Sequence, residues 1–548
     1  MRRVLWLLTP VMALLAGGGQ AVALADPVGG RPHGWLQMLT LAWLAWLLMD
    51  CAQRGGKPGR RGFLLGWLFA LGWLGGTFWW LFISMHRYGG LPAPLAALAV
   101  LALAGALALY YGAAAAVFST LFVAKTQVKP WYAALVFAAS WTLAELARGS
   151  FFTGFPWGAG GYAHVDGWLA GYAPWIGVYG IGFAAAWIAA FLAFTGTRCI
   201  AWLFPRDGLR QQGPWAAMVI VTAVIALFPL YALPQSAQRI AQHMTSGSRA
   251  GAQPFMAVAL LQGNIAQDEK FIPGAGVADS LAWYGQQLHA ATAPLVVAPE
   301  TALPLLPPEL PAGYWEELQA RYAQGGQAAL IGVPLGDAMA GYTNSIAGLK
   351  PGQDAPYRYD KHHLVPFGEF VPPLFRWFTQ LMNIPLGDFA RGALVQPSFA
   401  WQGQRLAPNI CYEDLFGEEL AARFADPATA PTVLVNASNI AWFGDTVAID
   451  QHLAISRMRA LEFARPVLRA TNTGATAIID HRGAVTALLP RGTRGVLRGQ
   501  FEGRAAFTPY ARWVAKAGLW PLWALCLGAL GWAAVFRAKR STRNAQLF

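Results

Sequence analysis

The stretch RLAPNICYE, residues 405–413, predicts an apolar strand over 405–410 that runs directly into Cys411, with a helix beginning near Glu413. Similar short apolar runs on either side predict further strands, and amphipathic stretches between them predict helices. Strand–helix alternation followed by a hairpin indicates a layered α/β sandwich, which we place at residues 254–507. The predicted strands are 256–261, 295–298, 328–333, 344–349, 432–436 and 467–470, the helices 277–291, 314–323 and 449–463, and the hairpin 476–486.

The rest of the chain has the composition of a membrane protein. Of 548 residues, 56% are hydrophobic and 12% are charged, whereas soluble proteins typically carry about 25% charged residues. A membrane span needs about 20 mostly apolar residues, and eight runs are candidates. We therefore expect a seven-span helical bundle in residues 1–240, an eighth span at 512–538 and a basic tail at 539–548. The runs are 4–25, 35–51, 62–84, 94–124, 131–147, 174–195, 215–233 and 513–536.

The distribution of charge predicts how the chain is oriented in the membrane. The formal net charge is +13, but much of it lies in short loops between apolar runs, so nucleic-acid binding is not favoured. Basic residues gather before the first run, in alternate loops and after the last run, which predicts cytoplasmic termini and an external 254–507 domain. The first run also resembles a cleavable signal peptide. It is longer than the usual apolar core of about 7–15 residues, so we favour an uncleaved span.

Three ionisable residues stand where predicted extended segments end. Glu300 follows the strand 295–298, Lys361 follows the extended segment 357–360, and Cys411 ends the strand 405–410. Each alone is weak evidence, because a charged residue at a strand end is most often a solvated surface group. Together they form a coherent set: Glu300 as base and later acid, Cys411 as nucleophile and Lys361 as electrostatic stabiliser. The backbone N–H of Tyr412, at the start of the next helix, is a candidate oxyanion donor.

The sequences around these residues resemble a known family. The motifs APET (298–301), YDKHHLVPFGE (359–369) and NICYE (409–413) are similar to the Glu–Lys–Cys set of the nitrilase superfamily, whose fold is an αββα sandwich. With eight flanking spans, the whole chain resembles the bacterial apolipoprotein N-acyltransferase family. The resemblance implies supporting roles for Glu369 and Glu413 and an acyl site shaped by Tyr412.

The resemblance also implies the reaction and its place in the cell. An acyl chain passes from a membrane phospholipid, typically phosphatidylethanolamine, to Cys411 as a thioester. It then passes to the α-amine of the diacylglyceryl-cysteine at the N-terminus of an apolipoprotein. No metal or other cofactor is implied. The expected location is the bacterial inner (cytoplasmic) membrane, with the catalytic domain on the periplasmic side.

Several interpretations stay open at the level of sequence. Glu413 is alternatively a helix-start cap, and Glu369 alternatively a solvated turn carboxylate. The apolar stretch containing Trp377 and Phe378 is either a packed helix or a mobile arm that gates lipid entry. The stretch 151–158, with Phe155 and Trp157, is either an aromatic interface belt or a re-entrant floor.

Two rival functions also stay open. A membrane-tethered amidase of the nitrilase type, acting on a small amide, would use the same three residues. A transporter or scaffold with an inactive outer domain is a rival of another class, although the shortage of charges within the predicted spans argues against it.

Overall fold

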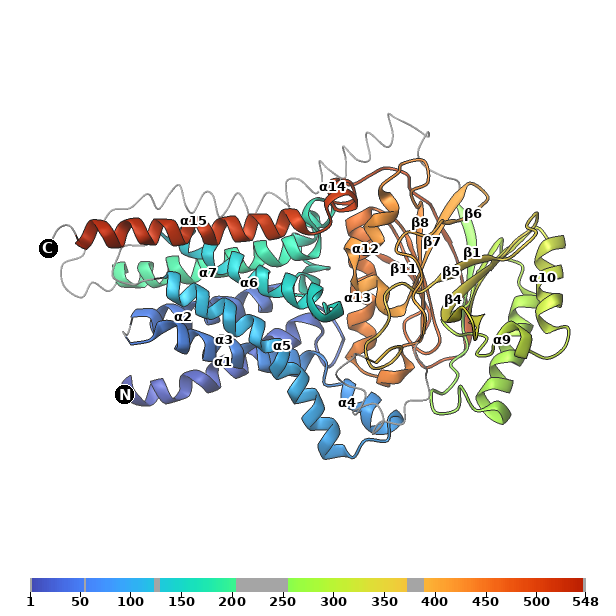
Figure 1. The fold of residues 1–548 in the computed structure, drawn as a ribbon, viewed down its shortest axis with the longest axis horizontal. Helices are drawn as coiled ribbons and strands as arrows, with labels where there is room; N and C mark the ends of the chain where they lie inside the picture. The colour runs from blue at the N-terminus through green and yellow to red at the C-terminus, as the bar shows by residue number, and fades with distance from the viewer. Residues whose placement is uncertain (1, 54–55, 123–128, 204–254, 372–388, 546–548) are drawn as a thin grey trace. The chain divides into compact units, whose positions relative to one another are not determined.

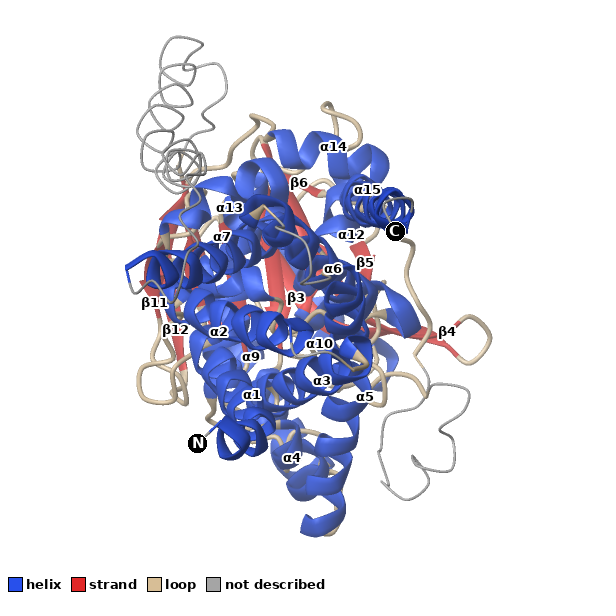
Figure 2. Ribbon diagram, turned by 90° about the vertical axis from the view of Figure 1, so that its left-hand side faces the viewer, coloured by secondary structure: helices blue, strands red, loops and turns tan. Residues whose placement is uncertain are grey.

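The computed structural model describes residues 2–53, 56–122, 129–203, 255–371 and 389–545. The chain divides into two compact units. The first combines Met1–Trp79, Ala97–Ile240 and Leu519–Phe548, and the second combines Trp80–Ala96 and Ala241–Gly518. Within the described ranges, every strand belongs to the second unit. Figure 2 shows the helices in blue and the strands in red.

Long helices make up most of the described part of the first unit. Glycines allow two of them, α1 and α3, to pack very closely. A Cβ atom added at Gly17 would lie 1.9 Å from the carbonyl oxygen of Phe69, and one at Gly72 would lie 2.2 Å from that of Leu14. Small residues commonly allow membrane helices to approach in this way. The helices are α1 (Arg2–Leu24), α2 (Gly34–Gln53), α3 (Pro58–Thr77), α5 (Ala93–Leu121), α6 (Pro130–Ser150), α7 (Ala173–Leu203) and α15 (Trp520–Ala545).

The prediction of eight spans is confirmed only in part. In the described residues, four helical segments are long and apolar enough to cross a membrane: Gly34–Ala52, Ala93–Leu121, Trp168–Gly196 and Trp520–Lys539. A fifth results if the pair Pro58–Thr77 and Leu81–Tyr88, bent by 62°, counts as one broken span.

The remaining predicted runs differ for identifiable reasons. Within α1 (Arg2–Leu24), the apolar segment Leu8–Leu24 has fewer than 18 residues and so is not among the spanning candidates. Helix α6, which carries Glu145 and Arg148, is not among the spanning candidates. The predicted run 215–233 lies outside the described residues.

The second unit is built on two six-stranded sheets. The first has the order β12-β1-β2-β3-β4-β5 and the second the order β11-β10-β9-β8-β7-β6. In the first sheet, β1, β2 and β3 are parallel, and in the second, β7, β8 and β9 are parallel. The strands of the first sheet are β1 (Met256–Gln262), β2 (Leu295–Val297), β3 (Ala328–Asp337), β4 (Gly341–Leu349), β5 (Tyr357–Asp360) and β12 (Gly495–Phe501). Those of the second are β6 (Phe399–Trp401), β7 (Gln404–Ile410), β8 (Val433–Ser438), β9 (Val467–Thr471), β10 (Ala477–Ile479) and β11 (Val485–Leu488).

Three hydrophobic clusters show that these sheets form the middle of a four-layer sandwich. The central cluster joins inward residues of both sheets, such as Leu260 and Leu330 with Ile410 and Val435. A second cluster packs α9 (Ala278–Ala290) and α10 (Tyr314–Gln324) on the outer face of the first sheet. A third packs α12 (Gly417–Ala421), α13 (Val447–Phe463) and α14 (Pro509–Ala517) on the second sheet. The resulting layers are α, β, β and α (Figure 1), as predicted.

Some elements of the second unit differ from the predicted ones. The helix expected near Glu413 is a short 3-10 turn, η7 (Cys411–Leu415), which begins at the cysteine itself. The strands β6 and β12 were not predicted, since three-residue β6 is too short to show a period and β12 contains two glycines. Strand β12 pairs antiparallel with β1 through seven residue pairs and completes that edge of the sheet.

Candidate active site

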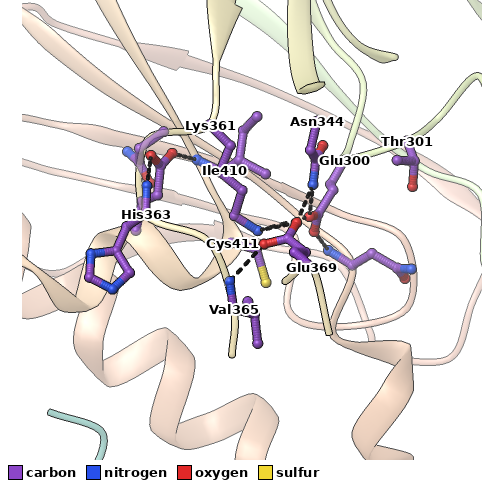
Figure 3. Close-up of polar contacts among 12 residues, drawn as sticks. Glu300, Thr301, Asn344, Lys361, His363, Val365, Glu369, Ile410 and Cys411 are labelled. Atoms are coloured by element: carbon purple, nitrogen blue, oxygen red, sulfur yellow. Dashed lines mark hydrogen bonds and ion pairs between the residues drawn. The ribbon is translucent and has the colours of Figure 1, made fainter. Parts of the chain in front are cut away.

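The fold brings the ends of several strands together at one edge of the sandwich. Because β2 and β3 are parallel and β5 runs in the direction of β3, Glu300 and Lys361 follow strand ends on the same edge of the first sheet. Cys411 follows β7 at the carboxyl edge of the parallel strands in the second sheet. The sulfur of Cys411 lies on the same side as the Lys361 amine and the two nearby carboxylates (Figure 3).

Glu300, Lys361, Glu369 and Asn344 form one buried hydrogen-bonded cluster (Figure 3). The Lys361 Nζ atom lies 2.8 Å from Glu369 Oε1 and 3.3 Å from Glu300 Oε1. The Asn344 side-chain amide donates to the same two oxygens at 2.7 Å each. Glu369 is therefore not a solvated turn carboxylate. It is buried, and its Oε1 atom accepts from the same two donors, Lys361 and Asn344, as Oε1 of Glu300.

Backbone N–H groups donate hydrogen bonds to the remaining oxygen of each of these two carboxylates. The backbone N–H of Asn439, just after β8, donates to Glu300 Oε2 at 2.8 Å. The backbone N–H of Val365 donates to Glu369 Oε2 at 2.8 Å. Each carboxylate is thus fixed at both oxygens, and the orientation of Glu300 depends on residues from both sheets.

The electrostatics of Lys361 favour its charged form. Burial lowers the pKa of Lys361, but the Glu369 and Glu300 carboxylates outweigh that effect and raise it above its usual value. Lys361 therefore acts as a permanent cation and hydrogen-bond donor. It is not suited to accept a proton from the thiol.

Cys411 is a thiol at rest and sits in a strained conformation. Burial and the charge of Glu300 raise the pKa of its thiol to about 12, although Lys361 opposes this. A thiolate is the reactive species, so the thiol needs a base at the moment of reaction. Cys411 has a φ of 51°, in the left-handed region that non-glycine residues rarely adopt. Backbone strain of this kind is commonly found at functional sites.

Glu413 links the end of β5 to the end of β7. Its Oε1 accepts from the backbone N–H groups of His362 at 2.7 Å and His363 at 3.2 Å. Its Oε2 accepts from the Ile410 N–H at 2.6 Å and from the Tyr359 hydroxyl at 2.8 Å. The bond to Ile410 caps the 3-10 turn, as the alternative interpretation of Glu413 predicted, but the other three bonds join the two sheets.

Tyr412 follows Cys411 and is buried among aromatic rings. Its ring meets Phe416 edge-on at 5.2 Å between centroids, and His363 lies 5.6 Å away. His363 stacks on Phe416 at 3.6 Å. Burial lowers the pKa of His363 to about 3, so this imidazole stays neutral and serves the packing of the turn.

Lys270 was missed by the sequence reasoning. It is 1% exposed, and its Nζ donates to the backbone carbonyl of Glu300 at 3.1 Å and to Thr301 Oγ1 at 2.7 Å. Burial lowers its pKa to about 8. Lys270 lies in a loop without apolar periodicity, and nothing in the sequence pattern distinguished it from a surface lysine.

The residues expected to control substrate access lie elsewhere. Trp377 and Phe378 fall in 372–388, outside the described residues. Phe155 and Trp157 belong to the first unit, in the loop between α6 and α7. The Arg148 guanidinium donates to the backbone carbonyls of both residues, and Glu145 accepts from the Gly160 N–H at 2.8 Å. These two charged residues of α6 therefore fix the backbone of that loop.

The arrangement suits covalent acyl chemistry without requiring a metal ligand set. A thiol, a carboxylate that can take its proton and a fixed ammonium ion are gathered at one strand edge. In the described part of the chain, no group of three or more His, Cys, Asp or Glu residues is placed to hold a metal ion.

Comparisons with known proteins agree with this architecture. Residues 17–191 match the family described as apolipoprotein N-acyltransferase N-terminal domain, and residues 257–510 match carbon-nitrogen hydrolase, which supports the nitrilase-like fold. An amidase from Nesterenkonia sp. aligns with 47% of this chain and 92% of its own, at 16% identity and a TM-score of 0.34. That likeness is too weak to add to the argument.

Two relatives cover nearly the whole chain. The apolipoprotein N-acyltransferase of Verminephrobacter eiseniae is 59% identical over 97% of this chain and 97% of its own length. That of Ralstonia nicotianae is 45% identical over 87% of this chain and 85% of its own. Identity at this level over almost the full length shows that the chain belongs to the apolipoprotein N-acyltransferase family.

Proposed function

We propose that the protein transfers an acyl chain from a membrane phospholipid to the α-amine of the diacylglyceryl-cysteine of an apolipoprotein, through a thioester on Cys411. Membership of the family gives the enzyme class: the protein is an acyltransferase that N-acylates apolipoproteins. The phospholipid donor, typically phosphatidylethanolamine, and the roles of single residues are part of the proposal. The observation that carries it is the gathering of Cys411 with Glu300, Lys361 and Glu369 at one strand edge.

In the first half-reaction, Cys411 Sγ attacks the ester carbonyl of the phospholipid while Glu300 takes the thiol proton. Glu300 suits this role because the resting thiol is protonated and Glu300 is held at both oxygens. The carbon–oxygen bond to the glycerol then breaks, and Glu300 returns the proton to the departing oxygen. The products are a lysophospholipid and an acyl thioester.

In the second half-reaction, the α-amine of the acceptor attacks the thioester carbonyl. Glu300 takes a proton from the amine, the carbon–sulfur bond breaks, and the proton passes to the cysteine sulfur. An amide forms and the thiol is regenerated. Because the acyl group stays on Cys411 between the two half-reactions, the kinetics are expected to be ping-pong.

The negative charge on the carbonyl oxygen needs stabilisation in both halves. The Lys361 ammonium is fixed beside the site by Glu369, and the backbone N–H of Tyr412 at the start of η7 is the second donor in our proposal. Asn344 and Glu369 keep Lys361 and Glu300 at a set separation from each other. The Lys361 ammonium is then free to stabilise the oxyanion while the Glu300 carboxylate takes and returns the proton.

The membrane arrangement follows the same logic. Both substrates carry lipid chains, so we place the 254–507 domain on the periplasmic face, with residues 1–240 and 512–538 in the membrane. Both termini and the basic tail 539–548 lie in the cytoplasm in this scheme. In spheroplasts, a tag after residue 548 should resist external protease. Digestion of the tag would overturn the proposed orientation.

The function is tested with detergent-purified protein, a phospholipid labelled in its acyl chain and a synthetic peptide beginning with diacylglyceryl-cysteine. The expected product is the peptide with one more acyl chain, and a lysophospholipid in equal amount. The Cys411→Ala variant should form neither product. Cys526→Ala, which removes a buried thiol from α15 in the first unit, is the matched control and should stay active.

Adding a small soluble amide to the same assay separates the rival amidase. A small soluble amide that is hydrolysed faster than the lipopeptide is acylated would favour that rival. Acylation by the Cys411→Ala variant would refute the thioester route. The curated relatives do not favour the rival functions.

A further inference from the structure

A second buried polar cluster lies behind Cys411 and has no part in the mechanism described so far. It consists of Asp414 on η7, His452 and Ser456 on α13, and Arg469 on β9. All four side chains are at most 2% exposed. His452 and Ser456 are four residues apart on one helix and therefore share a face.

The contacts of His452 determine its protonation. Its Nε2 atom lies 2.9 Å from Asp414 Oδ1 and 3.2 Å from the backbone carbonyl oxygen of Cys411. Both partners accept hydrogen bonds, so Nε2 carries the ring's hydrogen and shares it between them. Its Nδ1 atom lies 2.8 Å from the Arg469 guanidinium, which can only donate. His452 is therefore neutral and in the Nε2–H tautomer, and burial together with Arg469 lowers its pKa.

The other members close the network. Ser456 donates to Asp414 Oδ2 and accepts from the Arg469 guanidinium at 2.9 Å. The same guanidinium donates to the Asn436 side-chain oxygen at 2.9 Å. Asn436 in turn donates to the Cys411 carbonyl at 3.2 Å. Two branches that start at Arg469 thus end on one atom, the carbonyl oxygen of the nucleophile.

This convergence matters because of the backbone at Cys411. The left-handed φ of 51° is unfavourable for a residue with a Cβ atom and persists only where the surroundings enforce it. Two donors on the carbonyl fix the peptide plane that follows the cysteine. That plane contains the N–H of Tyr412 and is joined to the Cα atom that carries the Cys411 side chain.

We propose that Asp414, His452 and Arg469 are positioning residues, which hold the Cys411 carbonyl and thereby the turn that presents the thiol and the Tyr412 N–H to the acyl carbonyl. The inference rests on the proposed thioester function and adds residues to it. Asp414 orients His452 through Oδ1, and Arg469 imposes the tautomer that lets Nε2 donate. None of the three touches substrate.

The test separates positioning from simple stability. His452→Leu removes the donor to Cys411, whereas His452→Gln retains an N–H donor on a side chain that reaches as far. Thr432→Val is the matched control, because Thr432 is fully buried and hydrogen-bonded to Arg405 N and Gln404 Oε1, both at 2.8 Å, at the opposite end of β7 and β8. The full-length protein is used throughout.

The readouts are the melting temperature and the single-turnover rate at which labelled phospholipid acylates Cys411, measured against phospholipid concentration. A misplacement of about 1 Å can lower a rate about 10²-fold. We expect His452→Leu to lower the saturating rate about 100-fold, with the half-saturating concentration changed less than threefold. The saturating rate of His452→Gln should be at least tenfold higher than that of His452→Leu. Thr432→Val should be destabilised but acylate at the wild-type rate.

The outcomes are decisive in either direction. Wild-type acylation by His452→Leu, no recovery in His452→Gln, or an equal loss in Thr432→Val would each overturn the positioning role. Should His452→Leu fail to fold, Ser456→Ala replaces it, since it removes only one hydroxyl bridging Asp414 and Arg469. Ser456→Ala is then expected to acylate about tenfold more slowly, and an unchanged rate would overturn the proposal. Absence of acylation in the wild type would instead refute the proposed function.

Discussion

Replacing Glu413 by glutamine removes one acceptor from a buried carboxylate that four donors share. Oε1 serves the backbone N–H groups of His362 and His363, and Oε2 serves the N–H of Ile410 and the hydroxyl of Tyr359. The amide nitrogen of glutamine can only donate. Facing His362 and His363, it would orphan two N–H groups. Facing Tyr359, it orphans only Ile410, because the Tyr359 hydroxyl can rotate and accept.

The magnitude follows from the second orientation. One buried N–H without an acceptor costs about 1–3 kcal/mol, and three bonds that lose a charged acceptor weaken by about 1 kcal/mol each. Burial raises the pKa of Glu413, so removing its charge recovers part of this loss. The net cost is about 2–5 kcal/mol. For a domain of this size that lowers the melting temperature by roughly 4–20 °C.

The assay is thermal unfolding of the full-length protein, followed by the single-turnover acylation rate. Because Glu413 ties the segment after Lys361 to the strand before Cys411, the acylation rate should fall as well. Glu309→Gln is the matched control, since Glu309 is exposed and accepts a single bond, from Leu306 N at 3.2 Å. A melting temperature of Glu413→Gln within 2 °C of the wild type would refute the four-donor account.

Three further predictions concern charges. Glu300→Gln should abolish acyl transfer yet speed alkylation of Cys411 by iodoacetamide at pH 9. Burial and the Glu300 charge together raise the thiol pKa to about 12, and the substitution removes that charge. Slower alkylation would contradict this. Burial lowers the pKa of Lys270 from 10.5 to about 8, so the unfolded chain binds more protons between those values and stability should rise with pH there. The difference in melting temperature between wild type and Lys270→Met should show that rise, and a flat difference would refute it. Arg148→Gln leaves at least one buried loop carbonyl without its donor and should lower the melting temperature by several degrees, an effect that Arg31→Gln in an exposed loop should not reproduce.

The three candidate residues were predictable because each follows a short apolar or extended run, and an acid, an amine and a thiol at such strand ends make one chemical set. The topology was not predicted: Glu300 and Cys411 follow parallel strands of two different sheets, whereas β5, before Lys361, pairs antiparallel with β4. Their catalytic roles stay a prediction that the experiments above must test.

The supporting contacts were less accessible to sequence reasoning. Lys270 lies in an irregular loop, and its approach to Glu300 depends on how that loop returns over the sheet. Asp414 reads as an ordinary acid in a short turn, and nothing in the sequence places it against His452, 38 residues away. Contacts of this kind follow from tertiary packing, which local patterns do not encode.

The membrane helices show a different limit. Hydropathy identifies runs such as α5, which is apolar throughout. It is less informative for α6, because the charged residues Glu145 and Arg148 of that helix are buried and hydrogen-bonded to a loop. A run length alone also does not reveal the 62° bend after α3. Composition therefore predicted a helical membrane region, and four or five of the predicted spans are confirmed in the described residues.

The most direct test of the thioester is to incubate the purified protein with acyl-labelled phospholipid in the absence of acceptor. The mass of the proteolytic peptide that contains Cys411 is then measured by mass spectrometry. We expect one acyl chain on this cysteine, which hydroxylamine removes and which passes to a diacylglyceryl-cysteine peptide when that acceptor is added. Acylated product in the absence of any adduct on Cys411, or a label that persists in Cys411→Ala, would contradict it.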